Sequence, residues 1–341
     1  MPLSEVLLIS MGLLTIAIVA AGLFRDFSIP YTVLLVVIGL GLSELTKTWH
    51  WLMPLQEFRL TPDLVFFVFL PALIFESGLS LDARQLIKDL APVLTLAIPA
   101  LLISTFLVGV GVWLLVDINF IIALLFGALI SATDPVAVVT LFKELGAPLR
   151  LNVLVEGESL FNDATAIVVF GFLLAMVVDG THFSLVNSGA ALLEFFRVFI
   201  GGVLVGVVIG LLVSEILFRL QCQVSAVITM SLVAAYGSFI ISEYLLHVSG
   251  VMATVFAAIV LNVYGLTRIS GDVKPILNET WEFVGLVANS FLFLLVGLSI
   301  DASSLITSSG LILVVVCIVL LARAATVYTL LPITTRLFKL P

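Results

Sequence analysis

Residues 119–144 read NFIIALLFGALISATDPVAVVTLFKE, and this stretch decides the fold. It is long and apolar enough to cross a bilayer as a helix, yet Ser131, Thr133, Asp134 and Pro135 interrupt it near its middle. Pro135 has no amide hydrogen, so the carbonyl of Ser131 loses its helical partner. In a bilayer such a carbonyl must be satisfied by protein or water. The sequence therefore predicts an interrupted helix that lines a cavity inside the membrane.

A simple kink at Pro135 is the alternative to an ion site. In that case Asp134 would only hydrogen-bond to the end of a neighbouring helix. A kink does not by itself require an acid, and an ionisable group at membrane depth is by default a candidate functional residue. Many secondary transporters hold ions at half-helix ends and freed carbonyls near the membrane midplane. We therefore favour an ion site.

The composition of the whole chain agrees with a membrane protein. Hydrophobic residues make up 62% of the 341 positions and charged residues 11%. A soluble domain has about 25% charged residues, so the composition excludes soluble globular proteins. The formal net charge of −8 includes acids that lie inside apolar segments. The first apolar run, residues 6–23, has no preceding basic residues and no following cleavage pattern, so we expect a membrane span and not a cleaved signal.

Apolar runs separated by polar or Gly/Pro breaks predict about eleven transmembrane helices. The expected spans are 3–24, 29–46, 61–79, 91–116, 119–144, 152–178, 187–220, 222–246, 250–266, 274–299 and 309–338. The connections are short, so we expect residues 1–341 to form a single transmembrane domain. Lys and Arg gather mainly after the odd-numbered spans, so the positive-inside rule predicts an outside N-terminus and a cytoplasmic C-terminus.

The sixth span opens with the polar sequence EGESLFND at residues 156–163. Glu158 and Asn162 are four residues apart, and so are Ser159 and Asp163, so a helix brings their side chains onto one surface. Hard oxygen donors of this kind suit a small monovalent cation better than a transition metal. A buried lone carboxylate at Asp163 would hold either a proton or a cation. Such mutual exclusion is the chemistry of exchange between the two ions.

Two further ionisable groups, Glu76 and Arg323, lie deep in their predicted spans. A guanidinium cannot shed its proton, so a buried Arg323 requires an acidic partner. Glu158 is our first choice of partner and Glu76 the second, and the pair would be structural. Glu156 lies in a first helical turn, where an acid complements the helix dipole, and we favour that role for it.

Two other features are compatible with packing alone. Asn289 interrupts the apolar run 283–298, where it could bond either to a broken helix or to an ordinary neighbour. Gly202, Gly206 and Gly210 recur at intervals of four and form a small-residue stripe that permits close helix contact. We interpret the glycine stripe as a packing surface.

Together these motifs resemble the monovalent cation/proton antiporters of the NhaP and NHE type. The residues that carry the resemblance are ATDP at 132–135, EGESLFNDA at 156–164, Trp281-Glu282-Phe283 with Asn289, and Arg323. The resemblance covers almost the whole chain. It implies an all-α polytopic membrane protein with the NhaA-like inverted-repeat fold and two crossed discontinuous helices. It also implies a homodimer in the cell membrane, with an elevator-like movement, that contributes to pH homeostasis.

The resemblance further implies a role for each site residue. Asp163 would be the carrier for which Na+ and the proton compete, and Asn162 would orient the site. Oxygen ligands for Na+ or its waters would also come from Thr133, Asp134, Ser159 and Glu76. Asn162 stands where an electrogenic branch of the family has a second aspartate, which implies electroneutral exchange. The resemblance implies a transporter and not an enzyme, with no cofactor and no nucleic-acid partner.

Two other functions stay open. Antiport of K+ or Li+ is one, because discrimination of cation size depends on sub-ångström oxygen spacing that a sequence does not give. The other is a pore, or a non-transporting membrane scaffold or sensor, in which the buried charges only hold helices together.

The chain departs from the family pattern at its C-terminal end. Family members continue after the arginine-bearing helix with a second crossed helix and one more span, to about thirteen in all. This sequence stops at Pro341 without either. A first crossed helix without its inverted partner would leave helix dipoles and carbonyls near Asp134 uncompensated. We therefore expect a truncated version of a longer protein, in preference to a variant whose transport is in doubt.

Overall fold

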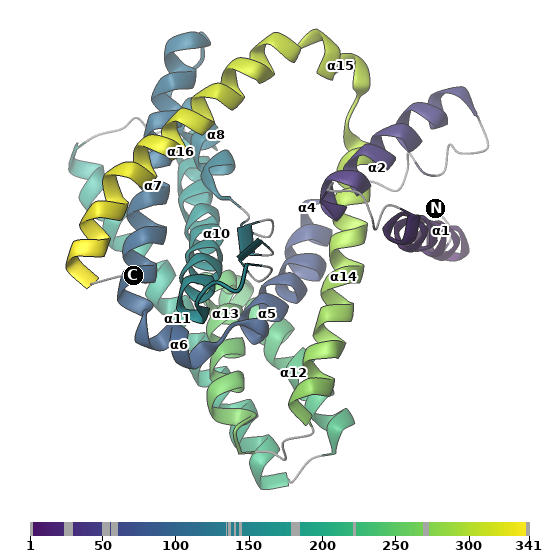
Figure 1. Cartoon of the computed structure of the whole chain (residues 1–341), viewed down its shortest axis with the longest axis vertical. Coiled ribbons are helices and arrows are strands. Elements are labelled where there is room, and N and C mark those ends of the chain that lie inside the picture. The colour runs from purple at the N-terminus through teal and green to yellow at the C-terminus, as the bar shows by residue number, and fades with distance from the viewer. Residues whose placement is uncertain are drawn as a thin grey trace. The chain divides into compact units, whose positions relative to one another are not determined.

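The architecture is all-helical in a computed structural model of the chain (Figure 1). The structure describes residues 3–23, 30–49, 55, 61–133, 135, 138–139, 141–142, 145–178, 185–220, 223–268 and 273–338. Within these ranges all regular structure is helical and no strand occurs, which confirms the predicted all-α class. Nine helices in the described part are long and apolar enough to cross a membrane. Two shorter apolar helices, at Phe120–Ser131 and Gly250–Gly265, account for the two other predicted spans.

Contacts divide the chain into two compact units. Unit 1 consists of Met1–Glu76 and Pro275–Gly310, and unit 2 of Ser77–Lys274 and Leu311–Pro341. The boundary falls within helices, so both units share α5, α14 and α16. That the units together form one transmembrane domain stays a prediction.

Unit 1 is built on α2 and α14. Its elements are α1 (Leu3–Leu23), α2 (Tyr31–Thr48), α4 (Pro62–Leu64), η2 (Val65–Phe69), α15 (Ala302–Thr307), and most of α5 (Leu70–Ser80) and α14 (Val273–Ser299). Gly39 and Gly297 allow the backbones of α2 and α14 to touch, since a Cβ on Gly39 would lie 2.9 Å from the Cα of Gly297. The π-helical turn η2 ends two residues before Pro71, which cannot donate a backbone hydrogen bond and disturbs the preceding turn.

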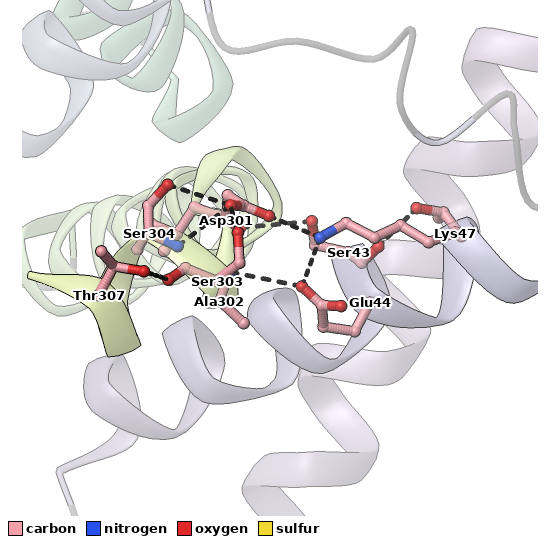
Figure 2. A network of polar contacts seen from close by, with 10 residues as sticks. Ser43, Glu44, Lys47, Asp301, Ala302, Ser303, Ser304 and Thr307 are labelled. Carbon is pink, nitrogen blue, oxygen red and sulfur yellow. Dashed lines mark hydrogen bonds and ion pairs between the residues drawn. The ribbon is translucent and has the colours of Figure 1, made fainter.

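A polar network joins the end of α2 to the start of α15 (Figure 2). The Nζ of Lys47 lies 2.7 Å from Glu44 Oε1 and 2.6 Å from Asp301 Oδ1. Asp301 also accepts the N–H of Ser304 at 3.2 Å and so caps α15. The hydrogen bond from Lys47 holds the pKa of Asp301 well below its usual value. These groups are exposed, so the network is a solvated tie between two helix ends.

Unit 2 contains the remaining helices. They are α6 (Ala83–Lys88), α7 (Leu90–Leu115), α8 (Phe120–Ser131), α10 (Leu149–Val178), α11 (Leu185–Leu220), α12 (Val224–Ile240), η3 (Ile241–Leu245), α13 (Gly250–Val260), η4 (Leu261–Gly265) and most of α16 (Ser309–Phe338). Helices α7, α8 and α10 pack on one another, and α11 packs on α13 (Figure 1). Buried Val108 and Val112 of α7, Ala123 of α8 and Ala322 of α16 form a common apolar cluster.

The glycine stripe of α11 makes the close helix contact that its spacing predicts. A Cβ on Gly206 would lie 2.8 Å from the Cα of Ala253, and one on Gly210 would lie 2.8 Å from the Cβ of Val260. Both neighbours belong to α13, and side-chain atoms do not approach each other this closely. The packing role of the stripe is therefore confirmed.

Asn262, in the π-helical turn η4, ties three segments of unit 2 together. Its Nδ2 donates to the carbonyls of Leu79 and Leu81 at 2.9 and 3.1 Å. Its Oδ1 accepts from Nζ of Lys274 at 2.9 Å. Asn262 is only 5% exposed, so these bonds satisfy a buried amide while holding the end of α5 and the start of α14 against η4.

Candidate functional site

The helix that carries the ATDP motif breaks where the sequence predicts. Helix α8 ends at Ser131, and Ala132 has an extended backbone with φ −68° and ψ 134°. Ser131 is 1% exposed, and its hydroxyl has no hydrogen-bond partner among the described residues. Thr133 and Pro135 are described outside any helix, and the predicted site residue Asp134 lies outside the described residues. The interruption of the predicted span is thus confirmed. The Ser131 hydroxyl is a further oxygen atom at the break, and our list of site residues did not include it.

The broken end of α8 is joined to α10 by one side chain. The hydroxyl of Ser159 donates to the carbonyl of Thr133 at 3.2 Å. Ser159 is 7% exposed, so this contact lies inside the helix packing of unit 2. A carbonyl freed by a helix break is thereby satisfied by protein, as the low polarity of a bilayer requires. The structure therefore brings together two of the predicted site residues, Thr133 and Ser159.

Glu158 and Arg323 also come together, between α10 and α16. Nη2 of Arg323 donates to Oε1 of Glu158 at 3.1 Å, and Nδ2 of Asn162 donates to the same oxygen at 3.4 Å. The side chains of Arg323 and Glu158 are 25% and 15% exposed, whereas Asn162 is fully buried. Asn162 Oδ1 and Arg323 Nη1 are buried without a hydrogen-bond partner among the described residues. The geometry fits a pair that fixes α16 to α10, and its structural role stays a prediction.

Asp163 is exposed, and our expectation of a buried carboxylate is wrong for the described chain. Each residue of an α-helix is rotated by about 100° from the one before, so Asp163 lies to the side of the face on which Asn162 is buried. Gly171, Leu174 and Val178 of α10 are also exposed, but residues 164–170 between them and Asp163 are buried or half-buried. The pattern of polar residues predicts which of them share a surface, but not which surface neighbouring helices cover.

Glu76 lies in unit 1, on α5, next to α14. A Cβ on Gly285 of α14 would lie 3.1 Å from the Cγ of Glu76, so the two residues are in direct contact. Phe75 and Trp281 anchor the same two helices, with ring centroids 4.5 Å apart. The other described candidates belong to unit 2, and the part of Glu76 in a shared cation site stays a prediction.

An ion pair that our sequence analysis did not foresee lies at the start of α10. Arg150 donates to both carboxylate oxygens of Asp89, with Nη2 to Oδ1 at 2.7 Å and Nε to Oδ2 at 3.1 Å. Asp89 is 3% exposed and precedes the first residue of α7. The hydrogen bond from Arg150 holds the pKa of Asp89 below its usual value. The partners are 61 residues apart, so no local pattern could have revealed the pair.

The sequence is similar to that of known transporters over most of its length. A family model described as "Sodium/hydrogen exchanger, transmembrane" matches residues 13–340. The Na+/H+ antiporter ApNhaP of Aphanothece halophytica is 36% identical over 95% of this chain and 60% of its own length. NhaG of Bacillus atrophaeus is 37% identical over 88% of this chain and 57% of its own length. NhaH of Halobacillus dabanensis is 32% identical over 93% of this chain and 79% of its own length.

The fold is shared with a solved antiporter structure. The sodium proton antiporter MjNhaP1 from Methanocaldococcus jannaschii superimposes with a TM-score of 0.78 at 22% identity, over 95% of this chain and 79% of that one. The chain thus spans only 60% of the length of ApNhaP and 57% of that of NhaG, although 95% and 88% of its own residues are aligned with them. The helix break, the α10 motif and the family match agree, and the chain belongs to the sodium/hydrogen exchanger family.

Proposed function

We propose that this protein is a secondary active antiporter that exchanges Na+ for protons, with the two ions competing for Asp163. The observation that carries the proposal is the hydrogen bond between Ser159 and the Thr133 carbonyl at the break of α8. This hydrogen bond places the Ser159 hydroxyl oxygen and the Thr133 carbonyl oxygen beside a helix end. Asp163 follows Ser159 by one helical turn. The relatives ApNhaP, NhaG and NhaH are named Na+/H+ antiporters, which supports the same activity.

In this proposal Asp163 accepts either a proton or the cation. The hydroxyl of Ser159 and the carbonyl of Thr133, one helical turn away, would add neutral oxygen ligands. Na+ would be held by Asp163, Thr133, Ser159 and Glu76, with Asp134 acting on the ion or its waters. Asn162, anchored on Glu158, orients this part of α10. No cofactor takes part, because one ion simply displaces the other.

The remaining details of the proposal come from the family resemblance. Asn162 next to the single carboxylate of Asp163 favours electroneutral one-for-one exchange. We further propose a homodimer in the plasma membrane, with crossed discontinuous helices in an inverted repeat and a role in pH homeostasis. The distribution of Lys and Arg favours an outside N-terminus and a cytoplasmic C-terminus.

Reconstituted protein tests the proposal. The 341-residue chain is placed in liposomes with a pH-sensitive dye inside, and proton flux is recorded after addition of Na+, Li+ or K+. We expect Asp163→Asn to abolish cation-dependent proton flux, because an amide cannot exchange a proton for a cation. Asp117→Asn, in the exposed connection between α7 and α8, is the matched control and keeps the flux.

The outcomes separate the candidate functions. Flux at the normal rate in Asp163→Asn would overturn the carrier assignment. Wild-type flux driven by K+ but not by Na+ would replace sodium with potassium as the substrate. An intact, folded wild-type protein with no coupled flux for any of the three cations would favour the non-transporting scaffold.

A further inference from the structure

Gly285 of α14 leaves the space that the Glu76 side chain occupies. A Cβ at this position would lie 3.1 Å from Cγ, 3.4 Å from Cδ and 3.4 Å from Oε2 of Glu76. The first of these distances is tighter than ordinary van der Waals contact, and the other two are at its limit. Gly285 lies within a regular helix, so its backbone conformation gives no reason for glycine here. Glycine is disfavoured in helix interiors, so the free space for Glu76 explains it better.

The helices on either side of this contact are held in place. Phe75 immediately precedes Glu76, and Trp281 lies one turn before Gly285. Their side chains are 0% and 1% exposed, and their ring centroids are 4.5 Å apart. Phe69 and Phe291 make a second, stacked contact between the same segments, with centroids 6.2 Å apart. A methyl group at position 285 would therefore displace the flexible Glu76 side chain rather than separate the helices.

We propose that Gly285 is a positioning residue that sets where the Glu76 carboxylate lies and thereby tunes cation affinity and selectivity. The inference rests on the proposed function, in which Glu76 is a ligand of the transported cation. Discrimination between cations of different radius depends on the spacing of oxygen ligands at sub-ångström scale. A shift of a few tenths of an ångström, which a Cβ would impose on Glu76, is of that size.

The test is Gly285→Ala in liposomes, with Na+ and Li+ titrated separately. We expect the half-saturating Na+ concentration to rise about threefold to tenfold, since small misplacements of a ligand weaken binding strongly. The ratio of the Na+ to the Li+ half-saturation constants changes, and the maximum rate changes less. Gly41→Ala on α2 is the matched control, because it also adds one methyl group to a helix of unit 1 and has no neighbouring atom within 4 Å. It leaves both constants unchanged.

A second background shows whether the effect passes through Glu76. Glu76→Ala removes the three atoms nearest to the new methyl group, so we expect Gly285→Ala to have no further effect on either constant in that background. If Gly285→Ala alone fails to fold, Glu76→Ala restores folding of the double variant. An equal shift of the constants in both backgrounds would overturn the proposal, and so would misfolding that Glu76→Ala does not relieve.

Failure of this inference and failure of the proposed function give different results. Gly285→Ala without effect, alongside a large effect of Glu76→Ala, overturns the positioning role and leaves Glu76 as a cation ligand. If Glu76→Ala changes no cation constant, both the positioning role of Gly285 and the role of Glu76 as a cation ligand are overturned. If the wild-type chain shows no flux, the Na+-induced rise in its melting temperature supplies the binding constants. The same comparison of variants then applies without reference to transport.

Discussion

Replacing Arg323 by methionine isolates the contribution of its ion pair with Glu158 to stability. At the observed 3.1 Å, the Coulomb attraction is about 5 kcal/mol for an effective dielectric constant of about 20. Desolvation offsets most of this: removal of one partner costs about 3–5 kcal/mol in a fully buried pair, and an exposed pair is worth about 0–1 kcal/mol. The two side chains are 25% and 15% exposed, so the pair lies between these limits. We expect Arg323→Met to cost about 2 kcal/mol.

Thermal unfolding in detergent, at one fixed scan rate, measures the effect. For a chain of 341 residues, a loss of about 2 kcal/mol corresponds to a melting temperature about 3 °C lower. Arg336→Met is the matched control, because it removes an exposed arginine near the end of the same helix, and we expect it to change the melting temperature little. The Arg323→Met/Glu158→Gln double variant should lose less than the sum of the single losses, since each single change leaves one charged partner behind.

The reasoning is refuted if Arg323→Met melts at the same temperature as Arg336→Met. It is also refuted if the two changes at positions 158 and 323 are simply additive. Either result would mean that the contact between α10 and α16 contributes no stability. The arginine would then have to be explained by another role.

Two further predictions concern unit 2. Asn262→Ala removes three hydrogen bonds, one of them to the Lys274 ammonium, and should destabilise the chain by about 2–4 kcal/mol, measured by thermal unfolding with Asn152→Ala as a comparison. The hydrogen bond from Arg150 lowers the pKa of Asp89 in the folded chain. The charged pair therefore stabilises the fold fully at a pH above 3.8, the ordinary pKa of the carboxyl group, and this stabilisation is lost as the pH falls through the lowered pKa. The melting temperatures of wild type and Asp89→Asn should therefore differ at neutral pH and converge below that value, and a constant difference would contradict the assignment.

The features that could be predicted from the sequence are those that follow from the chemistry of a single residue. Pro135 cannot donate a hydrogen bond, so the end of α8 at Ser131 could be predicted to within a turn. Arg323 cannot lose its proton, so its pairing with a nearby acid could be expected, and the chosen partner Glu158 is the one observed. Apolar length also predicted the bounds of the other spans to within a few residues, whereas the helix in the expected span 119–144 ends at Ser131.

Features that depend on distances between helices were beyond prediction. The exposure of Asp163 depends on which face of α10 its neighbours cover, and the helical period alone does not say this. The pairing of Asp89 with Arg150 joins residues from separate helices without any local signal. The contact between Gly285 and Glu76 requires the distance between α5 and α14, which two sequence positions do not contain.

Helix α10, which carries the proposed carrier Asp163, is held in place by contacts with two other helical segments. Glu158 and Ser159 are adjacent in sequence, so their side chains leave the helix about 100° apart. One is bonded to α16 through Arg323, and the other to the broken end of α8 through the Thr133 carbonyl. The helix is thus held from two directions one turn before Asp163, whose side chain stays exposed. Changes at 158 or 159 should therefore alter the position of the carboxylate while its own chemistry stays intact, so their effects on transport and on stability should rise together.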